Sequence, residues 1–252
     1  MHGYSIVTFE EVTSTNEIAL QAGKTELASG TVYVADRQTA GRGRRGRTWE
    51  SSKKQNLYFS LLLCPKVPAD KAHMLTLVMA YALADAIREL AGEKIAQIKW
   101  PNDIVVNGKK VAGILTEMGF REDKSFYVVI GVGVNLGKQE FSEELRDKAT
   151  DVCTECGHEI DKMELLSRTL ELFEKECKIF EKREDLTSLL PLYNGMLINR
   201  GKHVKVLDPK GEYQGIAQGI NEVGELLVEM PDGKVECVYA GEVSVRGIYG
   251  YV

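Results

Sequence analysis

A loop rich in arginine and glycine lies in the first fifth of the chain. Residues 37–52 read Arg-Gln-Thr-Ala-Gly-Arg-Gly-Arg-Arg-Gly-Arg-Thr-Trp-Glu-Ser-Ser, with five arginines and no acid between 37 and 47. Arginine pairs with phosphate or carboxylate through two parallel hydrogen bonds. The glycines at 41, 43 and 46 allow the backbone to approach a ligand closely. The composition therefore predicts a flexible loop that closes over a polyanion.

Other ligand-binding loops share parts of this pattern. Gly41, Gly43 and Gly46 match Gly-x-Gly-x-x-Gly, but polar residues flank them where a dinucleotide fold needs an apolar strand and helix. The sequence lacks the lysine strand and catalytic loop of a kinase. No Gly-Lys pair has the glycine that a Walker A loop places five residues earlier. An RNA-binding Arg-Gly segment and a solvated surface loop remain open as alternatives.

Polar residues also interrupt segments that otherwise read as strands. Lys99-Trp-Pro-Asn-Asp103 places a cation, an amide and a carboxylate around a strand break. Polar groups at sheet ends commonly line ligand sites, although Asn and Asp are equally common in simple turns. Lys110-Val-Ala-Gly113 and Gly131-Val-Gly-Val-Asn135 combine small residues with one polar group each. Glycine within a strand indicates close approach of something to the backbone.

Cys153 and Cys156, with His158 nearby, form the only metal-like cluster of the sequence. A zinc site needs a fourth ligand, and Cys177 is the sole candidate. The favoured interpretation is the end of a helix with Gly157 as its C-cap.

The elements that would position these residues can be read from periodicity and end signals. Ser14 predicts the start of a short helix, and Asp70 predicts a cap for a helix over 71–91 that ends at Gly92. Asp161, with Glu164 three residues later, predicts the start of a second long helix. The predicted core stripe of that helix is Leu166, Leu170, Phe173, Cys177 and Phe180. Strands are predicted over 31–35, 56–63, 95–100, 104–106, 111–116 and 126–134, with Asn107-Gly108 as a hairpin turn.

The pattern of predicted elements changes near residue 200, from helices and longer strands to short strands and turns. Short strands over 203–206, 213–220, 226–229, 235–239 and 243–246 are separated by turns at 208–211 and 231–233. This pattern predicts a small β-barrel, and extension of the first sheet by the same strands remains open as the alternative. The fold class is α+β: a mixed sheet with flanking helices over 1–199, followed by the barrel over 200–252.

Charge and composition exclude several classes of protein. The chain of 252 residues has 32 Lys and Arg against 37 Asp and Glu, so a globally basic nucleic-acid binder is not expected. Five scattered cysteines favour a reducing compartment over a disulfide scaffold. The N-terminus lacks a signal-peptide pattern, and the longest apolar run, 74–84, is too short for a membrane span. We expect a cytoplasmic protein with no membrane partner.

Six strings of the sequence, in this order and spacing, resemble biotin protein ligases. They are Ser14-Thr-Asn16, Gln38 to Trp49, Lys99 to Asp103, Lys110 to Leu115, Gly131 to Leu136, and Gly241 to Arg246. The resemblance covers nearly the whole chain. It implies the biotin–lipoate ligase fold, which is similar to class II synthetases, followed by an SH3-like barrel. It also implies that biotin is activated with ATP and Mg²⁺ to biotinyl-5'-AMP, with no tightly bound cofactor.

The resemblance assigns roles residue by residue. As catalytic residues it implies Lys110, Arg42 and Asp103. For biotin it implies Ser14, Thr15, Asn16, Gln38, Gly41, Arg42, Gly43, Arg44, Lys110 and Gly113. For ATP and the adenylate it implies Arg42, Arg44, Arg45, Arg47, Trp49, Asn102, Lys110 and Asn135. No metal ligand is assigned.

The resemblance also implies partners. The acceptor would be a lysine on a biotin carboxyl carrier domain of a carboxylase, and homodimers are expected by analogy. Some relatives carry an N-terminal DNA-binding domain. Because the Ser-Thr-Asn string begins at residue 14, we expect a ligase that does not bind DNA. Lipoate or octanoate ligation remains an alternative, although the glycine- and arginine-rich string from Gln38 to Trp49 favours biotin.

Overall fold

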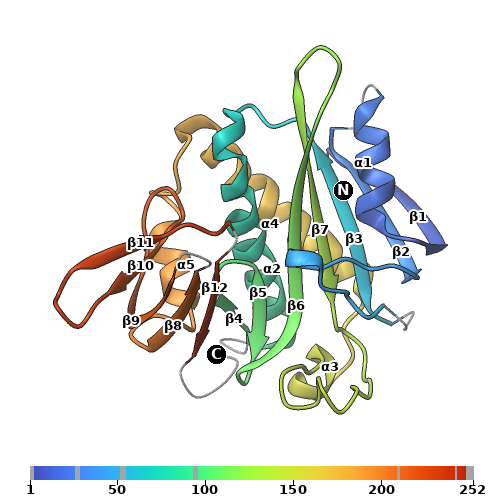
Figure 1. Cartoon of the computed structure of the whole chain (residues 1–252). Coiled ribbons are helices and arrows are strands. Elements are labelled where there is room, and N and C mark those ends of the chain that lie inside the picture. Colours follow the sequence, from blue (N-terminus) through green and yellow to red (C-terminus); the bar gives the residue numbers. More distant parts are fainter. Residues whose placement is uncertain are drawn as a thin grey trace.

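A seven-stranded mixed sheet forms the centre of the molecule (Figure 1). The computed structural model describes residues 3–25, 29–51, 55–92, 96–208, 211–241 and 243–247. The strands are β1 (Ser5–Val12), β2 (Thr31–Gln38), β3 (Leu57–Leu63), β4 (Ala96–Lys99), β5 (Asp103–Val106), β6 (Lys109–Phe120) and β7 (Phe126–Val134). Their order is β1-β2-β3-β7-β6-β5-β4, and only β1 and β2 run parallel among these neighbours. The predicted mixed sheet is confirmed.

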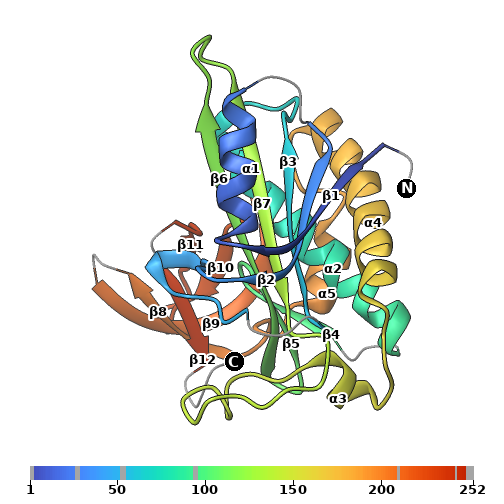
Figure 2. The same ribbon diagram turned by 90° about the vertical axis from the view of Figure 1, so that its right-hand side faces the viewer.

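Helices cover both faces of this sheet (Figures 1 and 2). Helix α1 (Thr15–Lys24) packs on one face, against β2, β3, β6 and β7. Helix α2 (Leu75–Ala91) lies on the other face, and α4 (Lys162–Arg183) packs against α2. Twelve of the seventeen residues of α2 are buried because the helix is enclosed by the sheet and α4. The amphipathic α4 buries the predicted stripe and exposes its charged face.

Only some helix ends follow the predicted local chemistry: α1 begins after Ser14 as expected, but the Ser14 side chain makes no capping hydrogen bond. Asp161 caps α4, accepting hydrogen bonds from the backbone N–H groups of Met163 and Glu164 at 2.8 Å. The prediction for Asp70 is wrong. Residues Ala69–Met74 form a 3-10 helix, and α2 begins only at Leu75 without a side-chain cap. Backbone bonds of the preceding turn replace the cap, since the N–H of Leu75 bonds to the carbonyl groups of that turn.

Two predicted turns are confirmed by their backbone angles. Asn107 and Gly108, with φ of 49° and 75°, connect β5 to β6 as the expected hairpin. Gly157, with φ of 81°, ends the short helix α3 (Val152–Cys156) as its C-cap. The predicted strand start at Ile95, the turn positions 209–210 and the loop residue Ser52 lie outside the described residues.

A second, antiparallel sheet follows α5 (Leu190–Met196). Its strands are β8 (His203–Asp208), β9 (Gly211–Ile220), β10 (Leu226–Glu229), β11 (Val235–Val238) and β12 (Ser244–Gly247). The order β11-β10-β9-β8-β12 is separate from that of the first sheet, so an extension of the first sheet is excluded. Within the described chain the ladder is open, with β11 and β12 at its edges, and no closed barrel is formed.

The two sheets are joined through a common core. The indole N–H of Trp100 donates to the carbonyl of Gly224 at 3.0 Å, and its backbone N–H donates to Asn199 Oδ1 at 3.1 Å. Ile198 N–H also donates to the carbonyl of Ile98 at 2.9 Å. These contacts hold the C-terminal sheet beside the β4–β5 turn. No helix in the described part of the chain is long and apolar enough to cross a membrane.

A candidate ligand site beneath the Arg/Gly loop

A buried network of neutral polar groups forms one end of the candidate site. Ser60 Oγ on β3 lies 2.7 Å from Thr15 Oγ1 and 2.5 Å from Asn16 Oδ1. Gln38 Oε1 accepts from the backbone N–H of Thr15 at 2.8 Å and from its hydroxyl at 3.1 Å. The side chain of Gln38 also donates to Ser51 Oγ at 3.1 Å. Because every donor has a named acceptor, this end of the site is preorganised.

Three glycines of β6 and β7 allow other groups to lie against the sheet. A Cβ atom at Gly131 would lie 1.9 Å from Asn16 Oδ1. Gly113 and Gly133 are cross-strand partners, and a Cβ on either would meet the Trp49 ring, at 3.0 Å and 2.6 Å. Only glycine leaves room for these contacts. The close approach predicted from the glycines therefore occurs, and its partners are Asn16 and Trp49.

The Arg/Gly loop is folded as a small hairpin over the sheet. Gly43 N–H donates to the carbonyl of Arg47 at 2.7 Å, and Trp49 N–H donates to the carbonyl of Gly41 at 2.9 Å. The tip, Arg44–Gly46, is a 3-10 turn in which Arg45 has φ of 59° and Gly46 has φ of 71°. A Cβ at Gly41 would lie 2.5 Å from the carbonyl oxygen of Trp49. The loop thus has a defined closed conformation.

Arg44 links this loop to two other parts of the chain. Its Nη1 donates to Asn102 Oδ1 at 2.9 Å, and its Nη2 donates to the carbonyls of Gly241, at 2.9 Å, and Ala240. Asn102 in turn donates from Nδ2 to the carbonyl of Ile114 at 2.9 Å. Burial lowers the pKa of Arg44, while nearby Asp103 opposes that shift. Arg44 therefore joins the loop, the β4–β5 turn and the C-terminal sheet.

Lys110, Asp103 and Lys99 form a compact charged group at the other end of the site. Lys110 Nζ lies 2.6 Å from Asp103 Oδ1 and 5.3 Å from the centre of the Trp49 ring. Lys99 is 5% exposed, and this burial lowers the pKa of its ammonium group to about 8, against the opposing pull of Asp103. One carboxylate thus faces two lysines, which leaves this end of the site cationic.

The segment before α3 lies beside the lysine of β6, an arrangement that the sequence did not predict. Lys110 N–H donates to the carbonyl of Lys148 at 2.8 Å, and Thr150 N–H donates to the carbonyl of Lys110 at 3.0 Å. Asn135 donates from Nδ2 to the carbonyl of Thr150 at 3.3 Å. An isolated bridge between β6 and a loop so distant in the chain leaves no local signal.

Most of the predicted residues line one small cavity. They are Ser14, Thr15, Asn16, Gln38, Arg42, Gly43, Arg44, Trp49, Asn102, Lys110 and Gly113. Sequence reasoning missed Ile114, Leu115 and Val132 of this lining, and it missed Ser60 and Glu117 behind it. Each of the last two had one signal in the sequence: Ser60 is a polar residue within an apolar strand, and Glu117 is an acid within another strand.

Five predicted residues lie outside the cavity lining. Gly41 lies behind Trp49, and Asp103 lies behind Lys110. Asn135 is buried and bonded to Thr150 rather than directed at the cavity. Arg45 and Arg47 are exposed, at the tip and on the outer side of the loop.

The cavity has a volume of about 40 Å³. One water molecule occupies about 30 Å³ of the liquid, and small-molecule sites typically have about 300–1,000 Å³. The Trp49 ring and the Lys110 side chain fill the space above Gly113 and Gly133. A ligand of ordinary size therefore enters only when the loop that carries Trp49 moves.

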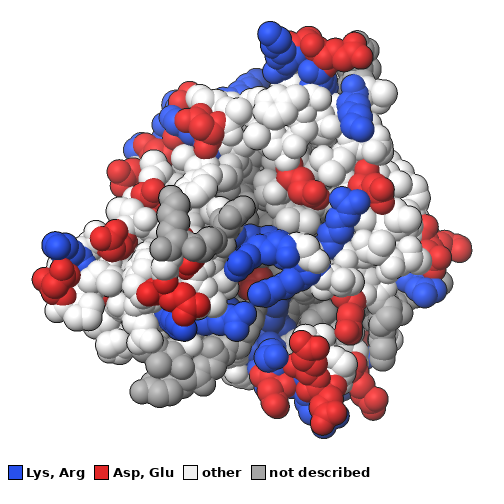
Figure 3. Space-filling model, in the orientation of Figure 1, with Lys and Arg blue, Asp and Glu red and all other residues white. Residues whose placement is uncertain are grey.

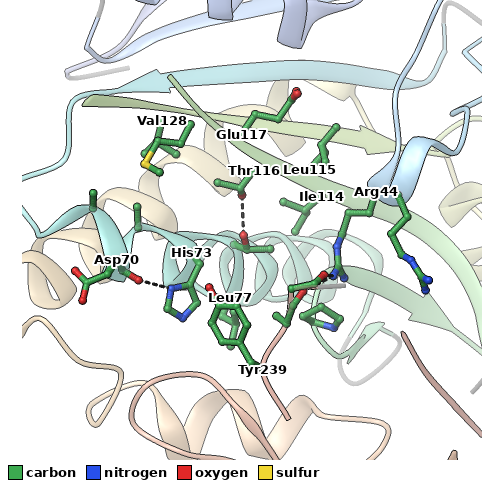
Figure 4. Close-up of a pocket in the computed structure, with 18 residues that line it drawn as sticks. Arg44, Asp70, His73, Leu77, Ile114, Leu115, Thr116, Glu117, Val128 and Tyr239 are labelled. Atoms are coloured by element: carbon green, nitrogen blue, oxygen red, sulfur yellow. Dashed lines mark hydrogen bonds between the residues drawn. The ribbon is translucent and has the colours of Figure 1, made fainter. Parts of the chain in front are cut away.

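A larger groove of about 470 Å³ adjoins the cavity (Figure 4). It lies between β6, the start of α2 and the segment Tyr239–Gly241, and it shares Arg44, Ile114 and Leu115 with the cavity. Lys and Arg side chains gather beside the hollow in the middle of this face (Figure 3). Arg44 and Arg45 are the arginines that line the groove.

No described residues form a group of three or more His, Cys, Asp or Glu that could hold a metal ion. Cys153 and Cys156 lie on α3, next to the C-cap at Gly157.

Comparison with known proteins identifies the family. Residues 8–135 match the model of the biotin/lipoate A/B protein ligase family, and residues 201–246 match the biotin protein ligase C-terminal domain. The bifunctional ligase/repressor BirA of Bacillus subtilis strain 168 is 35% identical over 245 residues, which cover 96% of this chain and 74% of BirA. The biotin–[acetyl-CoA-carboxylase] ligase of Paracoccus denitrificans is 34% identical, over 93% of this chain and 98% of that protein.

Solved structures agree with this result. The biotin protein ligase from Aquifex aeolicus in complex with biotin and ATP has a TM-score of 0.83 at 32% identity, covering 96% of this chain and 99% of that chain. The apo structure of the A. aeolicus ligase has a TM-score of 0.79. The family models, the full-length relatives and the fold agree, and the chain belongs to the biotin/lipoate A/B protein ligase family.

Proposed function

We propose that this protein is an ATP-dependent biotin protein ligase. It activates biotin to biotinyl-5'-AMP with release of pyrophosphate, and it then transfers biotin to a lysine of a biotin carboxyl carrier domain. The observation that carries this proposal is the cavity under the Arg/Gly loop. A preorganised neutral polar network forms one end of that cavity, and the Lys110–Asp103 pair, at 2.6 Å, forms the other. This arrangement suits an acid with a polar ring at one end and a carboxylate at the other.

The first step joins two anions. A biotin carboxylate oxygen attacks the α-phosphorus of ATP, and the bond to the leaving pyrophosphate breaks. Two unit charges at 4 Å repel by about 1 kcal/mol in water and about 4 kcal/mol at the effective dielectric of a protein surface. Lys110, Arg42 and Arg44 supply fixed positive charge where that repulsion develops. Mg²⁺ accompanies ATP and neutralises part of the triphosphate charge.

In the second step the carrier lysine attacks the acyl carbon of biotinyl-AMP. The nitrogen–carbon bond forms, the bond between the acyl carbon and the phosphate oxygen breaks, and AMP leaves. Asp103 holds Lys110 in place and Asn102 holds Arg44, so both position the reacting groups. The adenylate is a mixed anhydride that water destroys. Closure of the loop around the bound adenylate protects it.

The remaining assignments follow the position of each residue. Ser14, Thr15, Asn16 and Gln38 bind the ring of biotin, and Gly41, Gly43 and Gly113 allow close approach of the backbone. Arg45 and Arg47, at the outer side of the loop, attract the triphosphate as it enters. Asn135 supports the adenylate side through its contact with the segment at Thr150.

The groove of about 470 Å³ is the proposed place of the carrier domain. It opens next to Arg44 and runs along β6 beyond Ile114, whose N–H and carbonyl are both bonded to Asn102 of the β4–β5 turn. In the described structure β6 is paired there with β7 alone. An extended carrier segment can hydrogen-bond to this free edge and direct its lysine toward the cavity.

A direct test combines the purified protein with biotin, ATP, Mg²⁺ and a biotin carboxyl carrier domain. The proposal expects the mass of the carrier to increase by one biotinyl group on a single lysine, with one AMP released per group. A carrier variant in which that lysine is replaced by arginine is the control. Modification of the carrier by lipoate but not biotin would assign the protein to the related lipoate ligases.

Several further features belong to this proposal. We propose a boundary between a catalytic unit at 1–199 and an SH3-like unit at 200–252, supported by the separate order of the second sheet. We also propose a cytoplasmic homodimer that does not bind operator DNA. Sedimentation with and without biotin and ATP tests the dimer, and a gel-shift assay with the promoter of the biotin operon tests DNA binding.

A further inference from the structure

One carboxylate contacts both the polar network and the Arg/Gly loop. Glu117 Oε2 on β6 accepts from Asn16 Nδ2 at 2.8 Å. Glu117 Oε1 lies 3.9 Å from Arg42 Nη1. Figure 4 shows the Glu117 carboxyl group on the opposite side of the groove from His73 and Tyr239. Neither the sequence motifs nor the two reaction steps described above require Glu117.

The contact with Asn16 fixes which way the buried amide points. A carboxylate only accepts hydrogen bonds, so the NH₂ group of Asn16 must face Glu117. The carbonyl of Leu115, 3.2 Å from Asn16 Nδ2, favours the same orientation. Asn16 Oδ1 then faces Ser60, whose hydroxyl must donate to it across 2.5 Å. Ser60 Oγ also lies 2.7 Å from Thr15 Oγ1, whose own proton is donated to Gln38 Oε1.

The contact with Arg42 places a negative charge under the loop. Arg42 lies between two carboxylates, with Glu17 at 3.8 Å and Glu117 at 3.9 Å. The side chain of Glu117 is 28% exposed and that of Glu17 is 42% exposed. Both ion pairs are long and partly solvated, so each contributes weakly. In the described structure the Asn16 amide donates to Glu117 and not to its neighbour Glu17, whose second partner is the Thr13 hydroxyl.

We infer that Glu117 is a positioning residue that orders the donors and acceptors of the biotin pocket through Asn16 and steadies the closed loop through Arg42. This inference rests on the proposed function. It assigns to one side chain the link between recognition of the ring and closure of the loop. Glu17 shares only the second of these tasks, which makes it a matched control.

Three substitutions separate the two tasks. Glu117→Gln keeps an acceptor for Asn16 and removes the charge beside Arg42. Glu117→Leu removes both, and Glu17→Gln removes only the control charge. We expect Glu117→Leu to raise the KM for biotin about tenfold, as the loss of one buried hydrogen-bond partner does. We expect Glu117→Gln and Glu17→Gln to change that KM by less than about threefold, and all three to release biotinyl-AMP up to about threefold faster.

The readouts are the KM values for biotin and ATP, and kcat, in biotin-dependent ATP–pyrophosphate exchange, together with the dissociation rate of biotinyl-AMP. A positioning role predicts that only the KM for biotin changes strongly, while the KM for ATP stays within about twofold of wild type. General loss of structure would lower kcat and affect both KM values. If Glu117→Leu does not fold, Glu117→Asp, which withdraws the carboxylate by one methylene group, must reproduce the loss in biotin affinity.

Two outcomes overturn the inference. One is a Glu117→Leu or Glu117→Asp enzyme with the biotin KM of wild type. The other is a Glu17→Gln enzyme with the same loss of biotin affinity as Glu117→Leu. Failure of the proposed function is distinguished from both, because in that case the wild-type protein itself shows no biotin-dependent exchange.

Discussion

The two ends of the candidate site are built in different ways. At one end, Thr15, Asn16 and Ser60 are neutral, buried and joined by short hydrogen bonds between elements of regular structure. At the other end the side chains are charged. Arg44, which lies on the Arg/Gly loop, bonds there to the β4–β5 turn and to the C-terminal sheet. The first end provides fixed shape and hydrogen bonding for recognition. The second provides charge and movement for reaction and retention.

Substitution at the charged end should have the largest effect. We expect Lys110→Ala to lower the rate of adenylation about 100-fold or more, because the stabilising cation beside the reacting groups is lost. Biotin affinity should change much less. Single-turnover formation of biotinyl-AMP and equilibrium binding of biotin measure the two quantities. Equal losses in both would assign Lys110 to binding alone.

The next effect concerns the rigid end. We expect Gly131→Ala to raise the KM for biotin at least tenfold and to lower the free energy of unfolding by about 1–3 kcal/mol, because the new Cβ would lie 1.9 Å from Asn16 Oδ1. Gly195→Ala is the control, since its Cβ would meet open space on α5. Steady-state kinetics and chemical denaturation give both values. If the Gly131→Ala enzyme had the biotin KM of wild type, Asn16 could not be part of the biotin pocket.

Loosening the loop that retains biotinyl-AMP should have an intermediate effect. We expect Arg44→Ala to release biotinyl-AMP about tenfold faster, because the loop loses its bonds to Asn102 and to the carbonyls of Ala240 and Gly241. Arg37→Ala, which removes only an exposed ion pair with Glu11, should leave the rate unchanged. Stopped-flow dissociation measures the rate. Equal rates in the two variants would show that the bonds of Arg44 do not retain biotinyl-AMP.

The smallest effect is a pH dependence at the charged end. Burial lowers the pKa of Lys99 to about 8, so this ammonium group is charged below that pH and loses its charge as the pH rises through it. The exchange rate should therefore decline on the alkaline side, by less than about tenfold because Lys110 remains. In Lys99→Arg the charge persists, and the decline should move to higher pH. A pH profile identical to wild type would show that Lys99 does not contribute.

The same contrast explains what the sequence allowed us to predict. Helix ends at Gly92 and Asp161 and the hairpin at Asn107-Gly108 depend on neighbouring residues, and the structure confirms them. The 3-10 turn before α2 was missed because hydrogen bonds to backbone carbonyl groups hold it, and no side chain caps it. The open order of the second sheet depends on which edges meet, and strand signals do not specify this.

In the site, the residues on short continuous strings were found and those on distant strands were not. Ser60 meets Thr15 across 45 positions, and Glu117 meets Asn16 across 101. Both appear in the sequence only as polar residues within apolar strands. The exposure of Arg45 and Arg47 depends on how the loop folds, including the positive φ at Arg45, which the composition permits but does not specify.

The most direct test of the central claim is exchange of labelled pyrophosphate into ATP by the wild-type protein with Mg²⁺, in parallel with biotin, with lipoate and without acid. A biotin protein ligase should incorporate label only when biotin is present, since reversible formation of biotinyl-AMP returns pyrophosphate to ATP. Exchange with lipoate alone, or no exchange with either acid, would contradict it.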